Sequence, residues 1–271
     1  MMPFTTQTGF FGPEGARLYY EVAGAGHPVL LIHAGIADSR MWDDQFELFA
    51  QQYRVVRYDL RGFGQSEVPA GPFSQSEDIV NLLHLLGIQK TALIGISFGG
   101  KVALDFTLSY PDMVDALVLG APSVGGSPSS EDVQRFNEEE DAALAQSDLA
   151  AATEVNLRMW VDGPKRTPEQ VNPDVRERVR IMQRHAFTVP YPESAEELSL
   201  TPPAITRLTE IHVPTLVIVG DHDIPSKIAL TEHLATAIPG AQKVIIPGVA
   251  HMVSMEQPAV FNHAVLSFLT D

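Results

Sequence analysis

Short apolar runs that alternate with helix-like segments recur along most of the chain. The apolar runs cover residues 28–33, 54–59, 93–96, 115–120, 214–220 and 243–246. Runs such as 28–33, which are apolar at successive positions between turn residues, are typical of strands buried on both faces of a sheet. The alternation with helices predicts an α/β fold with a mainly parallel central sheet flanked by helices.

The segments between these runs have apolar residues at helical spacing. Ser74 and Glu77 have the spacing of a capping box, which marks the start of one such helix, and Gly87 marks its end. By the same criteria we expect helices at 40–52, 98–110, 226–238 and 258–269. A further strand is expected at 17–22.

The alternation stops between residues 122 and 206, where the chain has helix-like stretches at 131–146, 149–160 and 173–187. This segment holds 15 acidic and 8 basic residues, so it contributes −7 of the net charge of −16. It could be a solvated helical excursion or a cap that folds over the sheet. We favour the cap, because ligands bind open α/β sheets beyond the carboxyl ends of the strands. The predicted domains are a core of 1–121 and 207–271 and a helical cap (lid) of 122–206.

Composition narrows the class of protein. With 271 residues and 45% apolar content, the chain can bury a large core. It has no cysteine, which excludes disulfides, thiolate metal sites and a cysteine nucleophile. Neither a secretory leader nor a membrane span is recognisable, so a cytoplasmic location is expected. The acidic balance of 34 to 18 disfavours nucleic acid and anionic membranes as partners.

A serine lies at the centre of a strand–turn–helix stretch, residues 93–101. Gly95 and Gly99 stand two positions before and after Ser97, where bulky side chains would crowd a sharp turn. The helix that follows would direct the N–H of Phe98 toward an oxyanion formed at the serine. A G-x-S-x-G match alone also occurs in ordinary glycine-rich turns. Its position between a strand and a helix favours a reactive serine.

This stretch resembles the nucleophile elbow of the α/β-hydrolase superfamily. A serine nucleophile needs a base and an acid that orients the base. The segment from Gly248 to Pro258 is similar to the histidine loop of that superfamily, which implies His251 as the base. The acid in the family is usually the third residue after a glycine, which here selects Asp223, with Asp221 as the alternative.

The resemblance extends to two further loops. The second oxyanion donor is expected after the strand ending at His33, where most relatives have His-Gly and this chain has His-Ala-Gly-Ile. Alignment from His33 implies the N–H of Gly35, with the register open by one residue at Ala34. His33 itself is expected to hold the loop. The run 59–66 is similar to a family signature whose role is mostly structural.

The glycine-rich stretches lack both the dinucleotide pattern and the lysine–serine ending of a phosphate loop, and no histidine pair has metal-ligand spacing. We therefore expect no cofactor and no metal. The expected partner is a small-molecule substrate, and the protein is expected to be a monomer or a homodimer.

A serine hydrolase of this family would cleave a carboxylic ester or a lactone through an acyl-enzyme. We expect an apolar substrate of small to medium size, with Met159, Trp160 and Ile36 in its pocket and Met182, Phe187 and Tyr191 as neighbours. The alternatives are an enol-lactonase-like enzyme similar to the 3-oxoadipate enol-lactonases, a carbon–carbon bond hydrolase and a cofactor-free haloperoxidase activity. A different class is a ligand receptor on a hydrolase fold, which binds without turnover.

Overall fold

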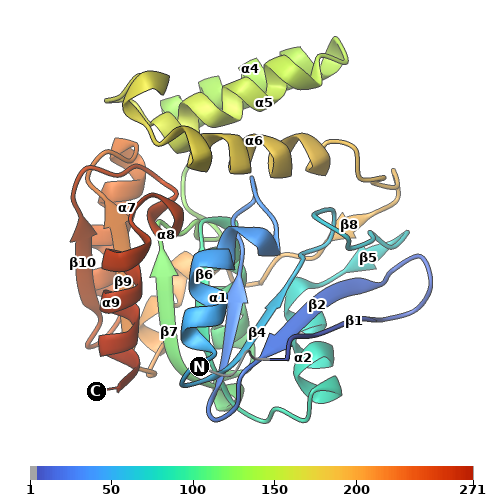
Figure 1. The fold of residues 1–271 in the computed structure, drawn as a ribbon, viewed down its shortest axis with the longest axis vertical. Helices are drawn as coiled ribbons and strands as arrows, with labels where there is room; N and C mark the ends of the chain where they lie inside the picture. Colours follow the sequence, from blue (N-terminus) through green and yellow to red (C-terminus); the bar gives the residue numbers. More distant parts are fainter. Residues whose placement is uncertain (1–4, 271) are drawn as a thin grey trace.

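The computed structural model describes residues 5–270, and its centre is an eight-stranded sheet (Figure 1). The strand order is β1-β2-β4-β3-β6-β7-β9-β10. β1 and β2 pair antiparallel, as do β2 and β4, and every other pairing in this sheet is parallel. The strands are β1 (Gln7–Phe11), β2 (Leu18–Ala23), β3 (Pro28–Ile32), β4 (Arg54–Tyr58), β6 (Thr91–Ile96), β7 (Val114–Gly120), β9 (Thr215–Gly220) and β10 (Gln242–Ile246).

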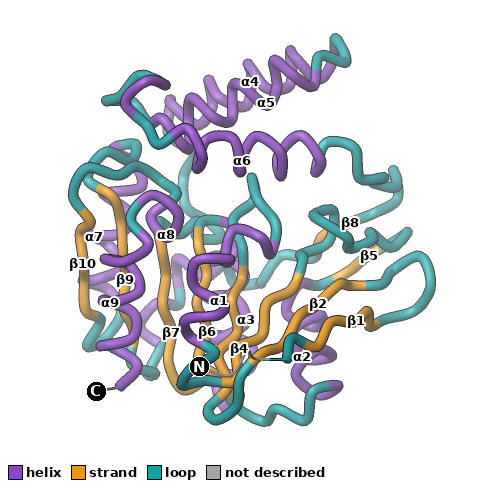
Figure 2. The backbone as a smooth tube through the Cα atoms, viewed as in Figure 1, coloured by secondary structure: helices purple, strands orange, loops and turns teal. Residues whose placement is uncertain are grey.

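Helices cover both faces of this sheet, as the backbone trace shows (Figure 2). The helices of the sheet region are α1 (Asp43–Phe49), α2 (Gln75–Leu85), α3 (Phe98–Ser109), α7 (Pro225–Ala237), α8 (Val253–Glu256) and α9 (Pro258–Thr270). The expected α/β fold is therefore confirmed. None of the helices within residues 5–270 combines the length and the apolar character that a membrane crossing requires.

Side-chain alternation along each strand builds two separate cores. In β3, Val29 and Leu31 belong to the core under α1 and α9, whereas Leu30 and Ile32 belong to the core under α2 and α3. Successive residues of a strand point to opposite faces, so a strand that is apolar at every position serves both cores. This is why the central strands lack the polar–apolar alternation of a half-exposed sheet.

The segment between β7 and β9 leaves the sheet and contains three longer helices. These are α4 (Glu131–Ala145), α5 (Leu149–Asn156) and α6 (Pro173–Ala186), and a π-helical stretch, η3 (Leu157–Asp162), continues α5. They lie across one end of the sheet (Figure 1). We call residues 122–206 the cap segment, although its limits as a domain remain a prediction.

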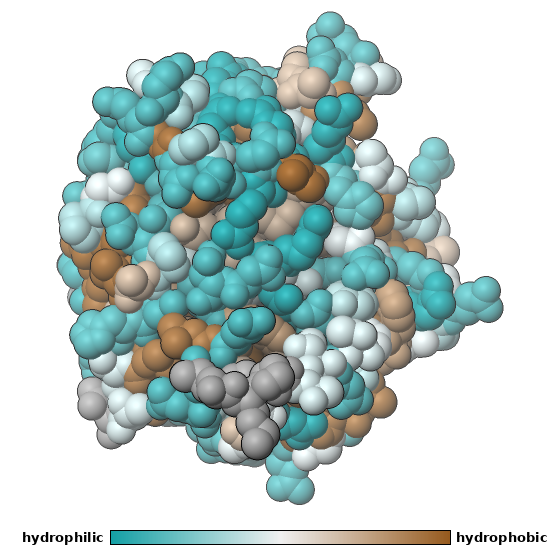
Figure 3. All heavy atoms as spheres, viewed as in Figure 1, coloured by the Kyte–Doolittle hydropathy of each residue, from teal (hydrophilic) through white to brown (hydrophobic). Residues whose placement is uncertain are grey.

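The cap segment is charged outside and apolar underneath. Hydrophilic side chains cover much of the face that Figure 3 shows over these helices. Below, Leu157, Val161, Val179 and Met182 join the core that also contains α1 and α9. The segment returns to the sheet region through β8 (Glu196–Glu197), which pairs parallel with β5 (Pro72–Phe73).

Candidate active site

Ser97 lies at a sharp turn between β6 and α3. Its backbone has φ 57° and ψ −114°, a conformation that costs a residue other than glycine of order 1–3 kcal/mol. The turn closes only because its flanking residues lack side chains. A Cβ on Gly95 would lie 2.2 Å from the carbonyl oxygen of Gly99, and a Cβ on Gly99 would lie 2.2 Å from that of Ile32. The two glycines are thus a steric requirement of the elbow.

His251 and Asp223 meet beyond the carboxyl ends of β9 and β10. His251 Nδ1 lies 2.8 Å from Asp223 Oδ2, and both side chains are almost fully buried. Asp223 Oδ1 accepts a hydrogen bond of 2.7 Å from the N–H of Ile224. The Asp223 carboxylate is therefore fixed by its neighbour and orients the imidazole through Nδ1.

The other ring nitrogen of His251 is available to a substrate or to the serine. His251 Nε2 is buried and has no hydrogen-bond partner within residues 5–270. His251 and Ser97 line the same cavity, which has a volume of about 370 Å³. A buried imidazole nitrogen without a partner normally costs free energy, so its presence on a residue that lines the same cavity as Ser97 suits a group that accepts a proton during a reaction.

Asp221, the alternative acid, has a different role. Its Oδ1 accepts a hydrogen bond of 2.7 Å from the N–H of Gly248, and its side chain is 44% exposed. It therefore closes the loop between β10 and His251, whereas Asp223 alone of the two contacts the imidazole.

Gly35 and Phe98, the predicted oxyanion donors, lie next to each other. A Cβ on Gly35 would lie 3.3 Å from Cβ of Phe98. Phe98 begins α3, so its N–H has no intrahelical carbonyl partner. The N–H of Gly35 makes no turn or loop hydrogen bond to another backbone group within the described residues, and Gly35 lines the cavity with Ser97. The role of these two N–H groups as oxyanion donors remains a prediction.

The loop that carries Gly35 is held by two buried side chains. His33 Nε2 accepts a hydrogen bond from the N–H of Leu60, so Nδ1 carries the proton and donates to the carbonyl of Ala34. Burial lowers the pKa of His33, which keeps this tautomer neutral. Asp59 accepts hydrogen bonds from the N–H groups of Ser39 and Gln65. This agrees with the loop-holding role expected for His33.

The walls of the cavity come from both the sheet region and the cap segment. Its apolar lining residues are Ile36, Phe63, Phe136, Trp160, Ala186, Phe187 and Tyr191, and its polar side chains are Arg61, Ser97, Glu140, Asn156, Gln183 and His251. Trp160 packs against His251, with ring centroids 4.6 Å apart. Met159 lines a different hollow with Arg158 and Pro164, and Met182 is buried in the core.

Three structural features near the site were not predicted from the sequence. The π-helical turn of η3 sets the position of Trp160. Arg166 pairs with Glu256, which in turn accepts a hydrogen bond of 2.9 Å from the N–H of Ala250 beside His251. Lys227 donates to the carbonyl of Pro122 and to Ser123 Oγ, and burial lowers its pKa to about 8. The resemblance of the histidine loop extends to Glu256 and Pro258, but nothing in the sequence indicated Arg166 as the partner of Glu256.

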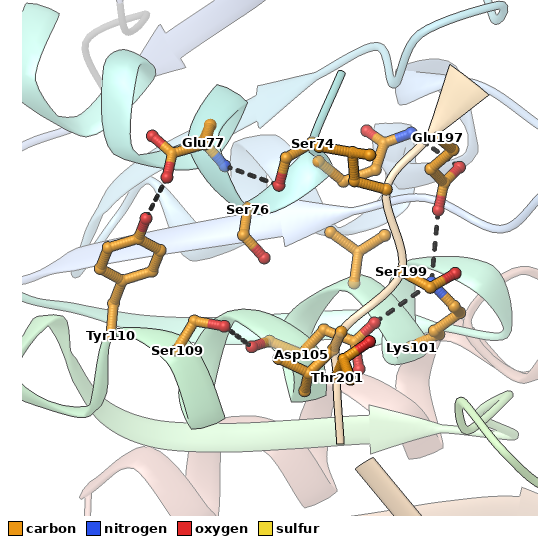
Figure 4. Close-up of a pocket in the computed structure, with 14 residues that line it drawn as sticks. Ser74, Ser76, Glu77, Lys101, Asp105, Ser109, Tyr110, Glu197, Ser199 and Thr201 are labelled. Atoms are coloured by element: carbon orange, nitrogen blue, oxygen red, sulfur yellow. Dashed lines mark hydrogen bonds and ion pairs between the residues drawn. The ribbon is translucent and has the colours of Figure 1, made fainter. Parts of the chain in front are cut away.

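Two other hollows lack the triad residues. One of about 290 Å³ surrounds Lys101, whose ammonium lies 3.1 Å from Asp105 and 3.3 Å from Glu197 (Figure 4). These pairs neutralise the lysine and attach the end of the cap segment to α3. The other, of about 660 Å³, lies between the start of α4 and α7. No group of three or more His, Cys, Asp or Glu side chains among residues 5–270 could hold a metal ion.

The fold and these loops define a member of the α/β-hydrolases. A family model described as alpha/beta hydrolase fold matches residues 27–258, so the chain belongs to this family. The chain is 30% identical to a solved hydrolase from Pseudomonas aeruginosa, with a TM-score of 0.79 over 97% of this chain and 98% of that one.

Two curated relatives from Bacillus subtilis differ in their named activities. One is a carboxylesterase, 25% identical over 89% of this chain and 79% of its own length. The other, 28% identical over 95% of this chain and 96% of its own length, is provisionally named a 2-succinyl-6-hydroxy-2,4-cyclohexadiene-1-carboxylate synthase. Family membership therefore fixes the scaffold, and the reaction has to be argued from the site.

Proposed function

We propose that the protein is a serine hydrolase that cleaves a carboxylic ester or a lactone through an acyl-enzyme intermediate. The observation that carries the proposal is the cavity that Ser97 and His251 both line. His251 contacts Asp223 through Nδ1, and its Nε2 has no hydrogen-bond partner among the described residues. The family match and the carboxylesterase among the relatives support the same reaction class.

In the proposed mechanism, Ser97 Oγ attacks the carbonyl carbon of the substrate and His251 Nε2 takes the hydroxyl proton. Asp223 holds the proton on Nδ1 and stabilises the imidazolium. The N–H groups of Gly35 and Phe98 stabilise the tetrahedral oxyanion, each contributing roughly 3–4 kcal/mol to the barrier reduction. His251 then passes the proton to the leaving alcohol, and a water activated by the same nitrogen releases the acid.

The walls of the cavity support a substrate of small to medium size with a substantial apolar part. Seven of its side chains are aromatic or aliphatic, and several come from the cap segment. We propose on this basis that residues 122–206 act as a cap that excludes water from the acyl-enzyme and selects the substrate, with Trp160 and Ile36 as part of the pocket. Because Met159 lines a separate hollow, we assign it no contact with substrate.

The experiment is hydrolysis of p-nitrophenyl acetate and butyrate by the purified protein and by Ser97→Ala. We expect Ser97→Ala to lower kcat at least 10⁴-fold, since little beyond oxyanion stabilisation and binding would remain. Ser109→Ala, which changes a partly exposed serine of α3 outside the cavity, serves as the control. Labelling with a fluorophosphonate should modify Ser97 alone. Equal turnover by wild type and Ser97→Ala would refute the proposal and favour a receptor.

A further inference from the structure

The active-site cavity has a polar region that the proposed chemistry does not use. Its polar side chains away from the triad include Glu140, Asn156 and Gln183. Each comes from a different helix of the cap segment: α4, α5 and α6. Three helices therefore each direct one polar side chain into a cavity whose other cap residues are apolar.

Glu140 is held in place by a buried amide. Asn156 is 1% exposed, and its Nδ2 donates to Glu140 Oε1 and to the carbonyl of Ala152. Burial raises the pKa of Glu140. Oε2 of Glu140 accepts no hydrogen bond from within residues 5–270, so this atom can accept a hydrogen bond from a ligand.

Gln183 lines the same cavity and has an unsatisfied polar atom. The residue is 4% exposed, and its Oε1 is buried without a hydrogen-bond partner among the described residues. An unsatisfied buried acceptor costs free energy, which a donor on a bound ligand would recover. Gln183 Oε1 and Glu140 Oε2 are therefore two acceptors, without partners in the described part of the chain, on residues that line this cavity.

Within residues 5–270, no free cation lines the cavity to balance these acceptors. Arg61 is the single lysine or arginine of this part of the chain that lines it. Its Nε and Nη2 donate to the two carboxylate oxygens of Asp78 at 2.6 and 2.5 Å, and its Nη1 donates to the carbonyl of Ala16. The guanidinium is therefore occupied. A carboxylate on a substrate would face the charge of Glu140 with no free cation among the described residues to compensate it, whereas an N–H group would meet acceptors.

We propose that Glu140, Asn156 and Gln183 form a subsite that selects substrates bearing an N–H donor, an amide or an amine, and rejects substrates bearing a free carboxylate. The subsite rests on the proposed function, because it recognises the part of the ester or lactone that extends from the carbonyl into the cap segment. Gln183 Oε1 accepts a hydrogen bond from the N–H group of the substrate. Glu140, which Asn156 holds in place, can also accept a hydrogen bond from such a group, and it repels a carboxylate.

The test compares matched p-nitrophenyl esters with acyl chains of four to eight carbons. Each chain ends in an acetamido, an N-methylacetamido or a carboxylate group. The N-methyl ester keeps the carbonyl and loses the donor. We expect wild type to prefer acetamido over N-methylacetamido by about tenfold in kcat/KM, with the difference mainly in KM, and to use the carboxylate ester least. A matching set of acetate esters of the ω-substituted alcohols tests the leaving-group side.

Two variants and one control assign the preference to the subsite. Gln183→Leu should abolish the preference for the acetamido ester. Glu140→Gln should raise kcat/KM for the carboxylate ester at least tenfold. Glu139→Gln changes the same charge one residue away, in a pair with Arg158 outside the cavity, and should change neither. Thermal unfolding of each variant checks that the cap segment remains folded.

The outcomes separate the subsite from the hydrolase. Equal rates for the acetamido and N-methyl esters in both series, or equal effects of Glu140→Gln and Glu139→Gln, would overturn the subsite while p-nitrophenyl butyrate turnover upholds the hydrolase. Calorimetric binding of the same ester pair to Ser97→Ala measures recognition without turnover. A binding preference for the acetamido ester there supports the subsite even if wild type proves inactive, and no preference refutes it.

Discussion

The sheet region and the cap segment are built on different physical principles. The central strands fill two apolar cores, and buried glycines and carboxylates fix the loops at their ends. The cap segment adds charge pairs to its apolar underside: Arg176 contacts Asp162 and Glu154, and Arg180 contacts Glu154 and Glu177. Close apolar packing tolerates little change, whereas partly exposed ion pairs such as those of Arg180 contribute little each. We therefore expect reactivity to depend on the sheet region and selectivity on the cap segment.

The largest expected effect tests whether reactivity depends on the sheet region. Asp223→Asn should lower kcat on p-nitrophenyl butyrate about 10⁴-fold, because a neutral amide neither keeps the proton on Nδ1 nor stabilises the imidazolium with a negative charge. Asp221→Asn in the same loop should change kcat less than tenfold, since Asp221 contacts Gly248 and not the imidazole. Steady-state kinetics on both variants measures this. A larger loss in Asp221→Asn would reverse the assignment.

The next effect concerns a contact between the two regions. Here the cap segment contacts the histidine loop, so it also supports a reactive residue of the sheet region. Arg166 and Glu256 form a buried pair, with side chains 8% and 5% exposed, and Arg166 also donates to the carbonyl of Gly248. Arg166→Met should lower the free energy of unfolding by about 3–5 kcal/mol, since it leaves Glu256 buried without its partner.

The control for Arg166 is another arginine of the cap segment. Arg158 pairs with Glu139, and both side chains are about half exposed. Arg158→Met should therefore cost under about 1 kcal/mol in urea unfolding. Equal losses in the two variants would mean that the pair with Glu256 does not connect the cap segment to the histidine loop.

A smaller effect depends on pH. Lys227 has a pKa lowered by burial from 10.5 to about 8, so the folded protein binds its proton less tightly than the unfolded chain does. Between pH 8 and 10.5 the unfolded chain holds more protons, and stability rises with pH. Relative to Lys227→Met, wild type should gain about 2 kcal/mol of unfolding free energy from pH 8 to pH 10. A pH-independent difference between the two proteins would contradict this.

The same contrast explains how far the sequence could be interpreted. Buried strands and helices with regular apolar spacing were predictable, because burial on fixed faces imposes a period on the sequence. Ser97, Asp223 and His251 were predictable as candidates because each follows a strand in a recognisable loop. The edge strand β1 was not predicted, since its five residues are mostly exposed and carry little apolar pattern.

The cap side of the cavity was least accessible to sequence reasoning. Of the two residues predicted at 159 and 160, Trp160 lines the cavity and Met159 faces another hollow, because adjacent residues of a helix point in different directions. Glu140, Asn156 and Gln183 are ordinary polar residues of amphipathic helices until the helices converge. Their proximity is a property of the tertiary structure alone.

The way the cap segment is attached has a mechanical consequence. Its later part is anchored to the sheet region by Arg166 and by the pairing of β8 with β5, whereas α4 buries only Ala143. Any widening of the passage to Ser97 should therefore come from α4 swinging outward while α6 stays in place. We expect the amide hydrogens of α4 to exchange with solvent faster than those of α6, and equal exchange would contradict this. This motion of α4 would move Glu140 away from Gln183. The subsite would therefore be complete only while the passage to Ser97 is narrow.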